Sequence, residues 1–184
     1  MTLAPLAFLP TDAMIAEYFC KGIETGLLPP EQARAWADSV IANTNEPLYA
    51  FIEVALSQGV PEIVSALKEV PGERDQSNVG RWLLAKLQKA EVQSTAGLSA
   101  AIRKAMLVCR HCGLDDQAYY EFDGIDDSLY LARHGQYGTV DECRADFLAC
   151  LQRHALPFPG ASEAQPCGQP HLGIMPRKAG YLER

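Results

Sequence analysis

The chain contains no apolar run that approaches the about 20 residues a membrane-spanning helix needs. Positive charge is also scarce, because 16 lysines and arginines stand against 23 aspartates and glutamates, which leaves a net charge of −7. General binding of a phosphate backbone requires a basic face, so this balance argues against a nucleic-acid partner. The four histidines form no H-E-x-x-H pair, and neither G-x-S-x-G, a Walker A loop nor G-x-G-x-x-G occurs. We therefore predict no membrane span, no nucleic-acid partner, no catalytic residue and no cofactor.

The length of 184 residues suits one domain with an appended tail. We expect a helical domain over residues 1–156 and a tail or strap over residues 157–184. The tail contains five prolines and four glycines, a composition that cannot form a long helix. We expect it either to be flexible or to lie over the helices through its scattered apolar side chains.

The N-terminal stretch MTLAPLAFLP is apolar but lacks a basic segment, and its run is broken by Pro5 and Pro10. It therefore does not resemble an export signal. Six cysteines without such a signal are typical of reduced thiols in a cytosol. The predicted location is cytoplasmic.

Apolar residues recur at helical spacing through most of the chain, and the segments are separated by short breaks of about 2–6 residues. This pattern predicts an all-α fold, an irregular bundle of seven to eight antiparallel helices. Thr139 and Glu142 form a capping box at the start of the last helix. Its expected buried stripe is Val140, Cys143, Phe147, Cys150 and Leu151.

The segment from Leu114 to Gly138 departs from this pattern. It contains β-prone aromatic residues, and Asp123-Gly124 is a turn signal. We therefore expect an acidic loop or small hairpin here, followed by a short helix over residues 128–133.

Just before that segment, Cys109 and Cys112 form the only C-x-x-C motif in the chain. At about 100° per residue, both cysteines lie on the apolar side of their helix, whereas His111 lies on the opposite side. We therefore interpret the cysteines as core residues and predict no metal site. A redox pair and a metal site are the alternatives. Cys167 and His171 could complete a Cys3His set, although nothing in the sequence shows that they meet the other two.

The acidic segment is the candidate functional site. It contains tyrosines among carboxylates, with no lysine or arginine over residues 114–127, and it does not match an EF-hand loop. Aromatic anchors supply buried area at an interface, and carboxylates steer a basic partner. Alternatively, the aromatics pack on the bundle while the acids face water. The candidate partner-binding residues are Asp115, Asp116, Tyr119, Tyr120, Glu121, Asp123, Asp126, Asp127 and Tyr137.

The segment Gly22 to Gly59, GIETGLLPPEQARAWADSVIANTNEPLYAFIEVALSQG, combines a G-L-L break, a helix with W-A-D and an E-P start before I-E-V-A-L. In these features it resembles small helical bacterial proteins of unassigned function, some of them associated with toxin immunity. The resemblance covers about a fifth of the chain and lies mainly on core and cap positions. It implies a bacterial cytosolic protein that binds another protein, and it carries over no active site.

Two hypotheses of function follow. The first is a non-enzymatic binding factor, with an immunity role as one form of it, whose acidic tyrosine-rich surface covers a basic site on a protein partner. The second is a helical enzyme or ligand-binding domain with a pocket between helices near Trp36, Trp82 and Tyr137. In that case His134 would act with Asp126 or Asp127.

Overall fold

The computed structural model describes residues 10–159, and all regular structure in this range is helical. The predicted all-α fold is confirmed, with eight helices in the described part. None of these helices is long and apolar enough to cross a membrane. The helices are α1 (Asp12–Glu24), α2 (Pro30–Ala42), α3 (Tyr49–Leu56), α4 (Val60–Glu69), α5 (Gln76–Leu87), α6 (Thr95–His111), α7 (Asp116–Arg133) and α8 (Val140–His154).

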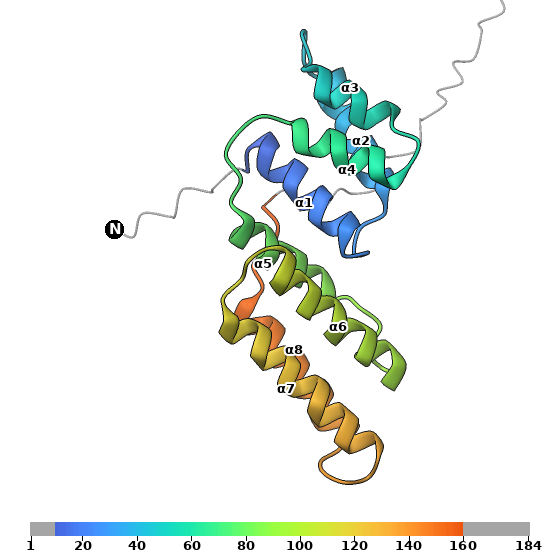
Figure 1. Cartoon of the computed structure of the whole chain (residues 1–184), viewed down its shortest axis with the longest axis vertical. Helices are drawn as coiled ribbons and strands as arrows, with labels where there is room; N and C mark the ends of the chain where they lie inside the picture. The colour runs from blue at the N-terminus through green and yellow to red at the C-terminus, as the bar shows by residue number, and fades with distance from the viewer. Residues whose placement is uncertain (1–9, 160–184) are drawn as a thin grey trace, which may run out of the picture.

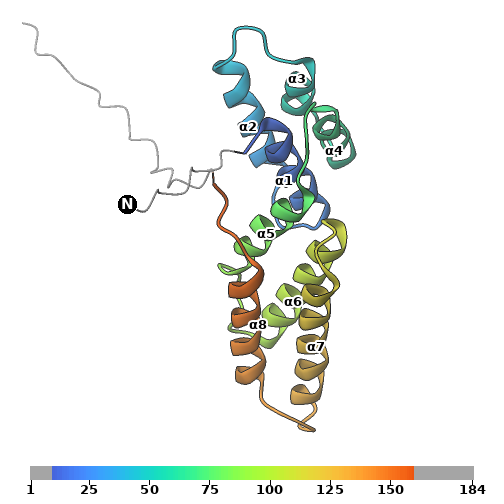
Figure 2. The same ribbon diagram turned by 90° about the vertical axis from the view of Figure 1, so that its left-hand side faces the viewer.

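The helices form an elongated stack (Figures 1 and 2). At one end α1 packs against α2 and α4, and α3 packs on these two helices, whereas at the other end α6, α7 and α8 run side by side. The fifth helix lies between the two groups and contacts α1 on one side and α6 and α8 on the other. The candidate segment therefore lies in the three-helix end, far along the stack from α3.

Aromatic side chains join the helices of both ends into one hydrophobic cluster. Trp36 of α2 lies between Phe19 and Phe51, with ring centroids 5.5 Å from each. In the other end, the rings of Phe122 on α7 and Phe147 on α8 meet edge to face at 5.9 Å. Both phenylalanines are fully buried, so this pair holds the α7–α8 contact.

The predicted core position of Cys109 and Cys112 is confirmed, because both side chains are buried within the cluster. His111 is exposed, as expected from the helical phase. Burial raises the pKa of each thiol to about 12, which keeps the sulfur protonated and unreactive. Cys167 and His171, the two other members of the hypothetical metal set, lie outside the described residues.

The first residues of the predicted tail do pack against the bundle. Phe158 stacks on Tyr18 at 4.5 Å and meets Trp82 edge to face at 5.3 Å. Just before it, Leu156 N donates to the backbone oxygen of Arg81 at 3.0 Å. The chain that leaves α8 is thus held against α1 and α5 as far as Phe158, and residues 160–184 of the predicted tail lie outside the described residues.

The prediction of an acidic loop or small hairpin after Leu114 is wrong, because the segment forms the continuous helix α7. Its first turn is capped by Asp115, whose side chain accepts a hydrogen bond from Ala118 N at 2.8 Å. Residues at alternating spacings of four and three then form an apolar stripe that packs on the bundle. They are Ala118, Phe122, Ile125, Leu129 and Ala132.

Burial of this stripe outweighs the β propensity of the tyrosines, because local propensities amount to only about 1 kcal/mol per residue. The turn signal at Asp123-Gly124 is overridden for the same reason. Gly124 lies inside α7 and does not have the positive φ that a two-residue hairpin turn would need, so no turn forms there.

Candidate functional site

The acidic segment is helical, so helical phase decides where each predicted site residue points. Asp116, Tyr120, Asp123 and Asp127 follow one another at spacings of four, three and four residues. At about 100° per residue they share the side of α7 opposite its apolar stripe. Tyr130 extends the same side by one more turn. We call these five residues the α7 stripe.

The α7 stripe faces solvent. The side chains of Tyr120 and Tyr130 are 66% and 60% exposed, Asp116 and Asp127 are exposed as well, and Asp123 is half-buried. None of its three aspartates takes part in an ion pair with another described residue. The stripe therefore combines unpaired negative charge with two large aromatic side chains that contribute little to the core.

Three of the predicted residues on or beside α7 point elsewhere. Asp115 serves as the cap of the helix. Tyr119 turns toward α6, where Arg110 donates a hydrogen bond to its hydroxyl and lies 4.5 Å from its ring centroid. Asp126 is half-buried and lies on the side of the helix that follows Tyr119. The tyrosine of this group is thus held by a cation of the protein itself.

The eighth predicted residue, Tyr137, is 76% exposed in the turn that joins α7 to α8. It follows the last turn of the helix and lies beyond the stripe. The structure therefore brings four of the nine predicted residues onto one surface, together with Tyr130, which was not among the nine.

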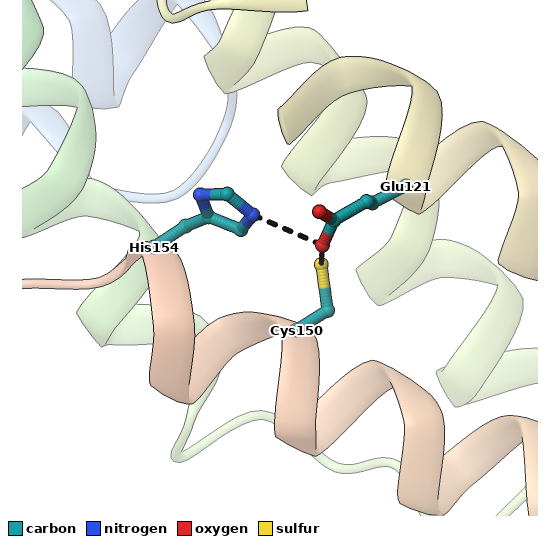
Figure 3. A group of neighbouring side chains, drawn as sticks. All are labelled: Glu121, Cys150 and His154. Carbon is teal, nitrogen blue, oxygen red and sulfur yellow. Dashed lines mark hydrogen bonds and ion pairs between the residues drawn. The ribbon is translucent and has the colours of Figure 1, made fainter. Parts of the chain in front are cut away.

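Glu121, the ninth predicted residue, turns from the stripe toward α8 (Figure 3). One oxygen of its carboxylate, Oε2, accepts from Arg153 Nη2 at 2.7 Å, His154 Nε2 at 3.1 Å and Cys150 Sγ at 3.4 Å. Its other oxygen accepts from Gln117 Nε2 at 3.1 Å. An acidic residue predicted to face a partner is instead the centre of a polar cluster between two helices.

The electrostatics of this cluster follow from those contacts. Hydrogen bonds from Arg153 and His154 hold the pKa of Glu121 down to about 2, so the carboxylate is charged. Burial, reinforced by the neighbouring carboxylate, raises the pKa of Cys150 to about 12. Both His154 and the thiol point at the same oxygen, so the imidazole is not placed to take the thiol proton. The cluster therefore lacks the base-to-nucleophile contact that an activated cysteine needs.

Cys150 and His154 were not predicted as site residues. The signal was available, because a cysteine and a histidine four residues apart share one face of a helix. That spacing shows only two members of the cluster. The third, Glu121, is distant in sequence and becomes a neighbour only because α7 and α8 pack together.

The residues of the hypothetical interhelical pocket do not meet. Trp36 of α2 packs against Phe19 in one end of the stack, whereas Trp82 of α5 packs against Phe158. Tyr137 is exposed beyond the end of α7. The structure thus gives no shared cavity for these three side chains.

The proposed acid–base partners of that pocket are also separate. His134 caps the end of α7, and its Nδ1 lies 2.7 Å from the backbone oxygen of Tyr130. Within residues 10–159, no ion pair joins it to Asp126 or Asp127. The His134–carboxylate pair that this hypothesis named is therefore not formed in the described residues.

No family model matches the chain, and no curated protein and no solved structure matches it either. The immunity-type resemblance of residues 22–59 is left untested by these comparisons. The α7 stripe and the cluster around Glu121 are the two features of the described residues that bear on function.

Proposed function

We propose that the protein is a non-enzymatic binding factor that covers a basic site on a protein partner with the α7 stripe. The observation that carries this proposal is the exposure of Tyr120 and Tyr130 on a helix side whose charged residues are all aspartates. Tyrosine buries a large area at an interface with little loss of side-chain freedom, and it carries a polar hydroxyl. The aspartates and the net charge of −7 favour the approach of a cation-rich surface.

Two other exposed carboxylates of the molecule are less suited to this role. Glu31 and Asp141 form ion pairs with Arg34 and Arg144 on their own helices. Such pairs neutralise the local field that would attract a basic partner. The stripe carries no such internal cation, so its field extends into solvent.

The mode of action that fits this surface is occlusion. A rigid helix side with aromatic anchors can cover a flat or grooved basic site without supplying chemistry of its own. Inhibition of a basic toxin by an immunity protein is one form of this action, and it is the form that the resemblance of residues 22–59 implies. We include a bacterial cytosolic setting in the proposal on the same ground.

The test is site-specific photo-crosslinking in cells that naturally express the protein. A photoreactive phenylalanine analogue replaces Tyr120 in one variant and Tyr130 in another. Both variants are expected to give the same dominant protein adduct, identified by mass spectrometry. Tyr49 on α3 is the matched control, because it is 70% exposed at the opposite end of the stack. Adducts shared equally by all three positions, or no adduct at the stripe, would contradict the proposal.

Charge reversal then tests whether the contact is electrostatic. The double variant Asp123→Lys, Asp127→Lys is expected to lose the adduct. The control Asp38→Lys, Glu46→Lys makes the same change of net charge at exposed positions on and after α2, and it should keep the adduct. Equal loss in both double variants would show a response to net charge alone and would reject the stripe as the binding surface.

A further inference from the structure

The cluster between α7 and α8 contains one carboxylate, one thiol and one imidazole that converge on a single point (Figure 3). The ligating atoms of Glu121, Cys150 and His154 all lie within 4.8 Å of one another. The thiol is fully buried, and the other two side chains are largely shielded from solvent. These three donor types are the ones that zinc takes in proteins.

The spacing of the three atoms suits a tetrahedral ion. In a zinc site with ordinary bond lengths, neighbouring ligand atoms lie about 3.6 Å apart. Glu121 Oε2 lies 3.4 Å from Cys150 Sγ and 3.1 Å from His154 Nε2. Sγ and Nε2 lie within 4.8 Å of each other, so adjustments of about 1 Å bring all three atoms to the spacing of a zinc site.

The backbone holds these donors in place. Cys150 and His154 occupy successive turns on one face of α8, the same four-residue spacing that places two ligands in helical zinc motifs. The end of that helix is fixed by Arg81 of α5, whose Nε donates to His154 O at 3.2 Å. Glu121 approaches from α7, which packs along α8 through the Phe122–Phe147 pair. The site is thus built on rigid elements.

We propose that Glu121, Cys150 and His154 bind one Zn²⁺ ion, with the fourth coordination position open to water. This inference goes beyond the proposed function, because the site lies on a different side of α7 from the stripe. On binding, the thiol releases its proton to solvent and forms an S–Zn bond. The proton that His154 Nε2 now donates to Glu121 is lost to solvent while Nδ1 takes one up, so the ring stays neutral and the freed Nε2 coordinates the ion. The thiolate and the carboxylate together balance the two charges of the ion.

Arg153 is the competitor for this site, since its guanidinium now contacts Glu121 Oε2. Its side chain is 59% exposed, so it can swing into solvent when the ion enters. The contact between Arg153 and Glu121 also allows a test of the direction in which the zinc affinity changes. If Glu121 is a zinc ligand, removing the arginine strengthens metal binding, whereas a purely structural ion pair predicts no metal binding to strengthen.

The experiment titrates the reduced, full-length protein with Co²⁺ as a spectroscopic probe and then displaces the cobalt with Zn²⁺. We expect one ion per chain and a thiolate-to-cobalt charge-transfer band that zinc abolishes. Cys150→Ala should eliminate the band, and Glu121→Gln should weaken zinc binding at least about tenfold. Arg153→Ala should tighten binding several-fold.

The matched control is Cys143→Ala, which removes another buried thiol from the same stripe of α8 and should bind like wild type. Cys167→Ala should do so as well. Failure of the wild-type protein to bind a stoichiometric ion would overturn the proposal, and so would a band that persists in Cys150→Ala. If Cys150→Ala fails to fold, Glu121→Gln and Arg153→Ala decide the matter, because they must shift the affinity in opposite directions.

Discussion

Both polar sides of α7 carry carboxylates, but the surroundings of these carboxylates differ between the two sides. On the stripe, Asp116 and Asp127 are exposed, Asp123 is half-buried, and none of the three forms an ion pair within the described chain. On the side toward α8, Glu121 receives three donors on one oxygen, and its pKa falls to about 2. A difference of one residue in helical phase therefore separates a carboxylate that the fold holds from one that it leaves free.

This difference between the two sides of α7 indicates a different role for each side. Clustered like charges on a helix side repel one another and add nothing to the stability of the bundle. Features that cost stability without a structural return are found at functional surfaces. The cluster on the other side has a structural explanation in its ion pair, and its thiol and imidazole add a donor set that a structural ion pair does not require.

The largest expected effect on stability comes from a substitution on the apolar side of α7, which packs on the bundle and thereby positions both polar sides. Phe122→Ala removes a fully buried ring that meets Phe147 at 5.9 Å. We expect a loss of about 3–5 kcal/mol in the free energy of unfolding, because the surrounding helices cannot fill the cavity. Urea denaturation followed by circular dichroism measures it.

Tyr120→Ala is the matched control on the stripe, where the ring is mostly in solvent. We expect a change below about 1 kcal/mol, most of it from the edge-to-face contact with Tyr119. Similar losses of unfolding free energy in the two variants would mean that Tyr120 is packed as part of the core. The distinction between an exposed side and a buried side of α7 would then be wrong.

A second, smaller effect concerns acid stability. The pKa of Glu121 is lowered from 4.5 to about 2 by folding, so the unfolded state binds the proton more tightly. Its contribution to stability is therefore complete above pH 4.5 and is lost as the pH falls toward 2. Because Arg153 is exposed, solvent screening limits this contribution to about 1 kcal/mol. Unfolding free energies measured between pH 7 and pH 3 test it.

Glu121→Gln should flatten that pH dependence, since the amide cannot take up the proton. Asp123→Asn removes a carboxylate without an ion pair from the same helix and should leave the profile of the wild type unchanged. An identical flattening in both variants would show that general charge repulsion, rather than the contacts of Glu121, governs the acid response.

Much of the fold was predictable because local signals and burial agree. The start of α8 was expected from its capping box, and the structure shows Thr139 N donating to Glu142 Oε2 at 2.8 Å. The two cysteines of the C-x-x-C motif were placed in the core by helical phase alone. At both positions the hydrophobic period and the local chemistry favour the same structure.

The prediction failed at α7, where the two kinds of signal disagree. Tyrosines and Asp123-Gly124 favour a hairpin locally, and the apolar period from Ala118 to Ala132 favours a helix. The period prevails because it buries a whole side of the segment. The cluster around Glu121 was beyond local reasoning, since it requires the packing of two helices whose residues lie about thirty positions apart.

The smallest expected effect decides most directly between the helix and the hairpin. Gly124 lies inside α7, and a methyl group added there would meet no atom within 4 Å. Gly124→Ala should therefore stabilise the protein by about 0.5 kcal/mol, because alanine loses less backbone freedom on entering a helix. In a two-residue hairpin turn the same residue would need a positive φ, and alanine would destabilise it. A lower urea midpoint for Gly124→Ala would contradict the helical structure at this position. The helical phase that places the stripe and Glu121 on different sides would then be contradicted as well.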